Sequence, residues 1–175
     1  MAHIHLPDGS FTLSWVLFWW VCALVPVGAS VIWTRRRAMD RRRIVVAAFM
    51  TAASFAAFLV EVPLFGGVHL NLTPLTGILA GPVLGSLIVF IVNILSAATG
   101  HGGWGLIGAN VLVNFSEVAT GWLAYRGLKR VTPGRFARAG MAGFGGLFVG
   151  NLAEVAIILA SGVQGVAQEG TRLLP

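Results

Sequence analysis

Apolar runs long enough to cross a bilayer are the feature that most constrains this chain. The first, FTLSWVLFWWVCALVPVGASVIW over 11–33, contains no charged residue. A helix needs roughly 17–25 residues to cross a hydrocarbon core about 30 Å thick. Charged residues make up only 10% of the chain, whereas soluble domains carry about 25%. We therefore expect an all-α integral membrane protein, a bundle of helices.

The apolar runs and the breaks between them predict one membrane domain over 1–175, with about six transmembrane helices. An outer segment over 1–10 precedes them. The expected helices are 11–33, 44–60, 74–81, 83–98, 106–125 and 141–162. The region 74–98 divides in two because Pro82 lacks a backbone N–H and clashes with the preceding turn. The short helix 74–81 would cross only part of the bilayer and line a cavity or pack inside protein.

The distribution of basic residues predicts the topology. Eleven of the twelve Lys and Arg residues lie in two short segments between apolar runs, 35–43 and 126–138. Loops on the cytoplasmic side carry such an excess. Both segments should therefore face inside, which puts the N-terminus, His69 and His101 outside. A nucleic-acid site would need a basic face on a folded domain, so we expect no nucleic-acid partner.

Two histidines stand within five residues of the amino terminus, in MAHIHLPDG. Imidazole and amine nitrogens suit late first-row divalent metals, and a planar nitrogen field favours Ni(II) or Cu(II) over Zn(II). If Met1 is removed, Ala2 supplies the amine and His3 supplies an amide and its ring. His69 is then the natural fourth donor, and His5 is the alternative ligand. If Met1 is retained, the terminal amine, two backbone amides and the ring of His3 would instead fill all four planar positions around the metal, without His69.

Other residues suggest supporting roles. His101, in His-Gly-Gly, would either cap the following helix or orient a metal ligand, because metal-bound histidines need such a partner. We expect Asn110 to support the metal ligands in the same way. Glu117 and Glu154 lie within apolar runs, where ionisable groups face the protein interior or a water-filled path. Three asparagines within apolar runs would either form hydrogen bonds between helices or, like the two glutamates, support a site, the packing or an ion path: Asn93, Asn114 and Asn151.

Small residues recur along the range 44–60. Ala48, Ala52 and Ala56 stand four residues apart, which places them on one face of a helix. Such a face lets another helix approach closely. The partner is either another helix of this chain or a separate membrane subunit.

Three stretches carry a family resemblance: His-Leu-Pro-Asp-Gly near the start, VHLNLTPLTGILAGPVLG and HGGWGLIGANVLVN. They resemble the substrate-binding (S) component of cobalt/nickel energy-coupling factor (ECF) transporters, the CbiM/NikM family, in order over residues 3 to about 160. The resemblance implies a substrate-specific subunit in the cell membrane of a prokaryote. Its cargo would be Ni(II) or Co(II), both of which accept nitrogen donors, and it would carry no organic cofactor.

The resemblance also implies ligands and partners. The metal would be held by the terminal amine, by the amide and ring of a histidine at position two, which His3 matches after loss of Met1, and by His69. His101 matches the His-Gly-Gly loop of the family. The partners would be the transmembrane coupling subunit, the ATP-binding subunits, a small membrane accessory subunit and membrane lipid. The alanine face is similar to the strip that contacts the coupling subunit. The resemblance implies a transporter subunit rather than an enzyme. The chain contains no Gly-rich Lys-Ser/Thr phosphate loop, so its partners would hydrolyse ATP.

Two departures from the family pattern stand out. Members typically begin Met-His, so that alignment on Pro7-Asp8-Gly9 favours His5 as the ligand, whereas alignment on the terminus favours His3, which we choose. Relatives also have a further helix after the region matching 141–162, and the chain lacks it; either the chain is truncated or a partner supplies that helix.

Two other functions are open. One is a membrane zinc hydrolase, which the absence of a His-Glu-x-x-His pair and of a carboxylate beside His69 or His101 in the sequence disfavours. The other is an ECF component for an organic, vitamin-like substrate.

Overall fold

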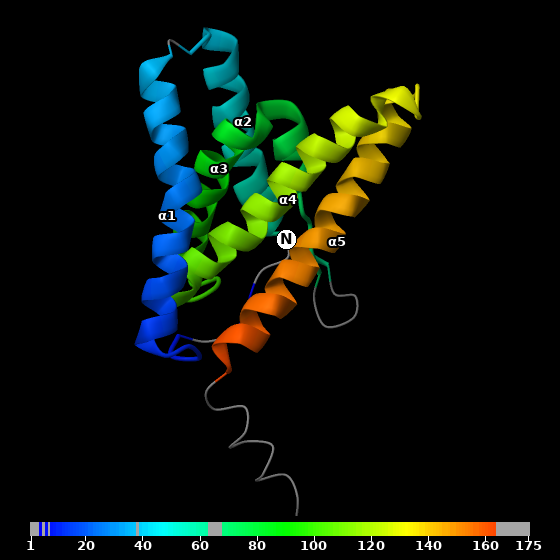
Figure 1. Ribbon diagram of the computed structural model, residues 1–175. Coiled ribbons are helices and arrows are strands. Elements are labelled where there is room, and N and C mark those ends of the chain that lie inside the picture. The colour runs from blue at the N-terminus through cyan, green and yellow to red at the C-terminus, as the bar shows by residue number, and fades with distance from the viewer. Residues whose placement is uncertain (1–3, 5, 7, 38, 63–67, 164–175) are drawn as a thin grey trace, which may run out of the picture.

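The computed structural model describes residues 4, 6, 8–37, 39–62 and 68–163. Helices dominate this part of the chain (Figure 1): α1 (Leu13–Arg36), α2 (Arg41–Phe58), α3 (Thr73–Ala98), α4 (Ile107–Gly127) and α5 (Arg135–Ser161). Two 3-10 helices, η1 (Trp104–Leu106) and η2 (Leu128–Arg130), flank α4. The strands β1 (Glu61–Val62) and β2 (Val68–His69) form an antiparallel pair. Apart from this pair, the described regular structure is helical.

The surface of the bundle is apolar. Large side chains such as Leu13, Phe144 and Leu159 are each more than 70% exposed. Helices α1, α3 and α5 are long and apolar enough to cross a membrane. A soluble protein rarely leaves such extensive apolar surface uncovered. The predicted class, a multi-pass helical membrane protein, is therefore confirmed.

Helix α3 lies between α1, α2 and α4, and α5 packs along α4 (Figure 1). Gly77 of α3 is so close to α4 that a Cβ there would overlap the backbone of Val118. On α4, a Cβ at Gly121 would lie 2.8 Å from the carbonyl oxygen of Pro74. Small residues allow this approach, which is how helices gain packing contacts in a membrane.

Helix α3 is interrupted at Gly81. Its φ of 77° and ψ of 170° are not helical, and a positive φ costs glycine little because it has no Cβ. The sequence predicted two helices here, 74–81 and 83–98. The structure shows one helical element, Thr73–Ala98, with a break inside it, because the helix resumes directly at Pro82.

Two helices begin earlier than the sequence suggested, inside the basic segments. Helix α2 starts at Arg41 rather than 44, and the Asp40 side chain caps it by accepting a hydrogen bond from the N–H of Arg42 at 3.5 Å. Helix α5 starts at Arg135 rather than 141. Arginine is a good helix former, so a basic segment outside the apolar run can still be helical.

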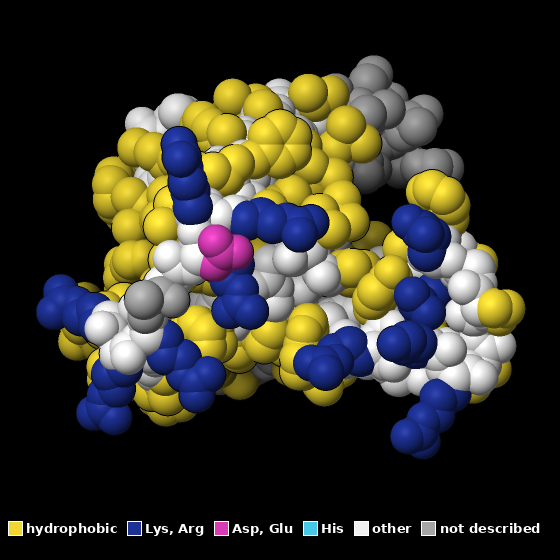
Figure 2. All heavy atoms as spheres, turned by 90° about the horizontal axis from the view of Figure 1, so that it is seen from above, with side chains coloured by type: hydrophobic (Ala, Val, Ile, Leu, Met, Phe, Trp, Pro, Cys, Tyr) yellow, Lys and Arg dark blue, Asp and Glu magenta, His cyan; other side chains and the backbone are white. Residues whose placement is uncertain are grey.

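The basic residues gather at one end of the molecule. Figure 2 views this end, where the Lys and Arg side chains of the α1–α2 and α4–α5 connections lie together. Some stack on aromatic rings: Arg126 lies 4.6 Å from the ring centre of Trp122, and Arg138 lies 4.3 Å from that of Tyr125. The α3–α4 connection and the start of α1 lie toward the other end (Figure 1).

Candidate metal site

His69 and His101 meet beside the end of α2. Their ring centres are 5.6 Å apart, with the ring planes nearly perpendicular. Phe58, which is fully buried, touches both rings: it stacks on His69 at 5.0 Å and meets His101 edge-on at 5.6 Å. Both histidines are half-buried. Two histidines from separate connections of the chain thus form one nitrogen-rich cluster.

A tight turn after α3 positions His101. Its N–H donates to the carbonyl oxygen of Ser96 at 3.0 Å, and its own carbonyl accepts from the Ser96 hydroxyl at 2.8 Å. Gly100 and Gly102, on either side, have φ of 82° and 73°, values that favour glycine. The His-Gly-Gly motif therefore serves first to build the turn that presents the His101 ring.

A buried carboxylate of α4 holds the segment that follows His69. The Asn71 amide group donates to both carboxylate oxygens of Glu117, at 3.0 and 2.9 Å. The Asn71 side-chain oxygen accepts from the N–H of Thr73 at 2.7 Å, at the start of α3. Glu117 is fully buried. The sequence indicated Glu117 but not Asn71, whose place just before a Thr-Pro helix start is the signal that could have revealed it.

The N-terminal segment is anchored at two points. The N–H of Ile4 donates to the side-chain oxygen of Asn110 at 2.8 Å, and both residues are buried. The Asp8 carboxylate accepts from the N–H groups of Trp104 and Gly105, at 3.2 and 3.0 Å. Ile4 also packs in a core cluster that contains Phe11 and residues of α4 and α5. The segment thus lies against the beginning of α4, next to the connection that carries His101.

The remaining predicted site residues fall into two groups. Ala2, His3 and His5 lie outside the described residues. Within the part of the chain that the structure describes, no group of three His, Cys, Asp or Glu side chains is placed to hold a metal ion. A metal at His69 would therefore draw its other donors from backbone groups or from residues outside the described part of the chain. On α2, the predicted partner face is exposed at all three positions: Ala48, Ala52 and Ala56.

The fold and the histidine cluster together define a multi-pass membrane protein with nitrogen donors gathered away from its basic end. The chain belongs to the CbiM family, described as the cobalt uptake substrate-specific transmembrane region, whose model matches residues 5–174. This confirms the family resemblance seen in the sequence. Members of the family are transport components of metal uptake.

One curated relative and two solved structures are similar to this chain. A putative fused nickel transport protein NikMN of Archaeoglobus fulgidus is 32% identical over 148 residues, which are 82% of this chain and 48% of the relative. The chain thus spans about half the length of that protein. A crystal structure of a truncated transition metal transporter matches with a TM-score of 0.79 at 19% sequence identity. The match covers 89% of this chain and 74% of the transporter chain. A crystal structure of a transition metal transporter matches with a TM-score of 0.77 at 19% sequence identity. That match covers 86% of this chain and 68% of the transporter chain. At this identity the two structures support the fold alone.

Proposed function

We propose that this chain is the substrate-specific subunit of an ECF transporter and captures Ni(II) or Co(II) for ATP-driven uptake. The observation that carries the proposal is the meeting of His69 and His101 beside the anchored N-terminal segment. Imidazole and amine nitrogens suit these metals. Ni(II) and Co(II) are the cargo in this proposal, and no organic cofactor takes part.

The proposed ligands are the Ala2 amine, freed by removal of Met1, the amide and ring of His3, and the His69 ring. His5 is the alternative to His3. Asn110 would support the site because its bond to the N–H of Ile4 restrains the backbone one residue beyond His3.

His101 would support the site in a different way. Its ring lies edge-on to both His69 and Phe58, so it restricts the rotation of the His69 ring.

The positive-inside bias supports an orientation with the basic end in the cytoplasm and the N-terminus outside. The two halves of α3 would then count as separate membrane segments, six in all, in the cell membrane of a prokaryote. ATP hydrolysis would belong to ATP-binding subunits. The exposed face of Ala48, Ala52 and Ala56 would meet the transmembrane coupling subunit, with a small membrane accessory subunit completing the complex.

The test is metal retention by the purified full chain after size-exclusion chromatography, read by elemental mass spectrometry. H3A and H69A should each lose bound Ni(II) and Co(II), and H101A should release them faster. L70A is the matched control, because Leu70 adjoins His69 but is 51% exposed. Intact mass with bound metal reports the state of Met1 at the same time.

Each outcome discriminates between functions. Unchanged retention in H3A and H69A would refute the metal-capture proposal and favour an organic substrate. A visible spectrum of the bound metal that indicates tetrahedral rather than planar coordination would favour zinc-type chemistry.

A further inference from the structure

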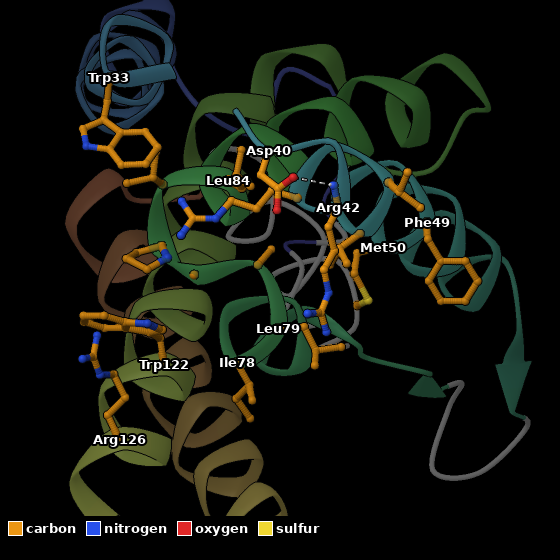
Figure 3. A pocket seen from close by; sticks show the side chains of 17 residues that line it. Trp33, Asp40, Arg42, Phe49, Met50, Ile78, Leu79, Leu84, Trp122 and Arg126 are labelled. Carbon is orange, nitrogen blue, oxygen red and sulfur yellow. Dashed lines mark hydrogen bonds between the residues drawn. The ribbon is translucent and has the colours of Figure 1, made fainter. Parts of the chain in front are cut away.

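An open groove of about 1020 Å³ lies at the basic end of the molecule (Figure 3). The end of α1, the first turns of α2, the broken region of α3 and the end of α4 contribute to it. Gly81 and Pro82 line it, so the break in α3 forms part of its wall. Neither the metal site nor the alanine face explains this groove.

The rim of the groove is positively charged. Arg42, Arg43 and Arg126 line it, against one acidic residue, Asp40. The Asp40 carboxylate accepts from the backbone N–H of Arg42 (Figure 3). Within the described residues, the three guanidinium groups form no ion pair with a carboxylate. The rim therefore offers unneutralised charge to an anionic ligand.

The wall below the rim is apolar and exposed. Val45 and Phe49 of α2 are 60% and 68% exposed, and Leu79 of α3 is 55% exposed. Phe49 follows Arg42 by seven residues, which is about 10 Å along a helix. Trp33 and Trp122 also line the groove, and tryptophan is typical of the membrane interface. The charged rim thus stands directly above exposed apolar surface.

We infer that this groove binds an anionic phospholipid of the inner leaflet. Its phosphate would lie among Arg42, Arg43 and Arg126, and its acyl chain would follow Val45 and Phe49. Basic pockets between transmembrane helices on the cytoplasmic side bind such headgroups. A phospholipid complements both halves of the groove, whereas an acidic protein segment would match only the rim. The inference rests on the proposed orientation of the chain and is independent of the metal ligands.

The test is native mass spectrometry of the full chain in detergent, titrated with phosphatidylglycerol or phosphatidylcholine. Wild type should retain phosphatidylglycerol selectively. The double variant R42Q/R126Q should bind it roughly thirtyfold more weakly, since each arginine near an anionic membrane surface contributes about 1 kcal/mol. R42K/R126K keeps the charge and should bind normally, which separates lost binding from misfolding. The matched control R35Q/R135Q removes the same charge outside the groove and should also bind normally.

Three results would overturn the inference. Equal losses in R42Q/R126Q and R35Q/R135Q would indicate general attraction to the basic end. Full competition by inorganic phosphate would show that the acyl chain contributes nothing. Unchanged lipid binding in R42Q/R126Q, with loss of the co-purified coupling subunit, would assign the groove to a protein partner. Ni(II) retention, measured in parallel, should be unchanged in R42Q/R126Q, so failure of the lipid site and failure of the metal site remain distinguishable.

Discussion

The buried pair Asn71–Glu117 offers the sharpest test of how the bundle holds the His69 segment. The substitution E117Q keeps the shape of the side chain but turns one of its two acceptor oxygens into a donor, which then faces the amide group of Asn71. The two bonds are 3.0 and 2.9 Å long and Glu117 is fully buried. A hydrogen bond to a charged group contributes about 1.5–3 kcal/mol, and a buried group without its partner costs a similar amount. We expect E117Q to lower the free energy of unfolding by about 2–3 kcal/mol.

The single cysteine makes the assay simple. Cys22 is half-buried in α1, so a thiol-reactive fluorophore reports unfolding of the purified chain in detergent. A loss of this size should lower the melting temperature by roughly 5–10 °C for a chain of this length. N71D should also destabilise the chain, because it places a second carboxylate against Glu117.

The double variant N71D/E117Q is the decisive one. The new amide group at position 117 can donate to the new carboxylate at position 71, and that carboxylate keeps an oxygen for the N–H of Thr73. We therefore expect the double variant to melt above N71D and near wild type. Additive losses in this double-mutant cycle would refute the claim that the two side chains interact as described.

Three further predictions use the same melting assay. D8A should lower the free energy of unfolding by about 1 kcal/mol, as loss of a helix cap does, and should also speed metal release. Equal rates of metal release from wild type and D8A would contradict the role of Asp8 in anchoring the N-terminal segment. G77A should cost about 1–3 kcal/mol by overpacking, whereas G28A, where a Cβ has open space, should be neutral or slightly stabilising. A52L should leave melting unchanged but reduce co-purification of the coupling subunit, with A29L on α1, also exposed, as the control; equal co-purification would assign the alanine face no partner.

The sequence predicted the helical membrane class and a break in the range 74–98 next to Pro82, which the structure places at Gly81. Both predictions depend on local properties: the hydropathy of a run, and a proline that lacks a backbone N–H. The same locality explains the errors at helix ends. Hydropathy stops where the arginines begin, but α2 and α5 extend into the basic segments because arginine is compatible with helix.

The candidate site was only partly visible in the sequence. The distribution of basic residues placed His69 and His101 on the same side of the membrane but did not show that they touch. Their contact through Phe58 could not be inferred, since Phe58 ends a different helix and has no distinguishing neighbour in the sequence. The bond between Asn71 and Glu117 joins residues 46 positions apart, and no periodicity reports such a pairing.

Hydropathy, charge and residue type are properties of the chain before it folds. They were enough to establish that this chain is a membrane bundle, where its basic residues cluster and which residues could supply nitrogen donors. Three features emerged only from the packed helices: Asn110 holds the N–H of Ile4 across 106 positions, Phe58 contacts both histidines, and four helices line an open basic groove. Such features depend on side-chain shape at contacts distant in sequence, which no local pattern records.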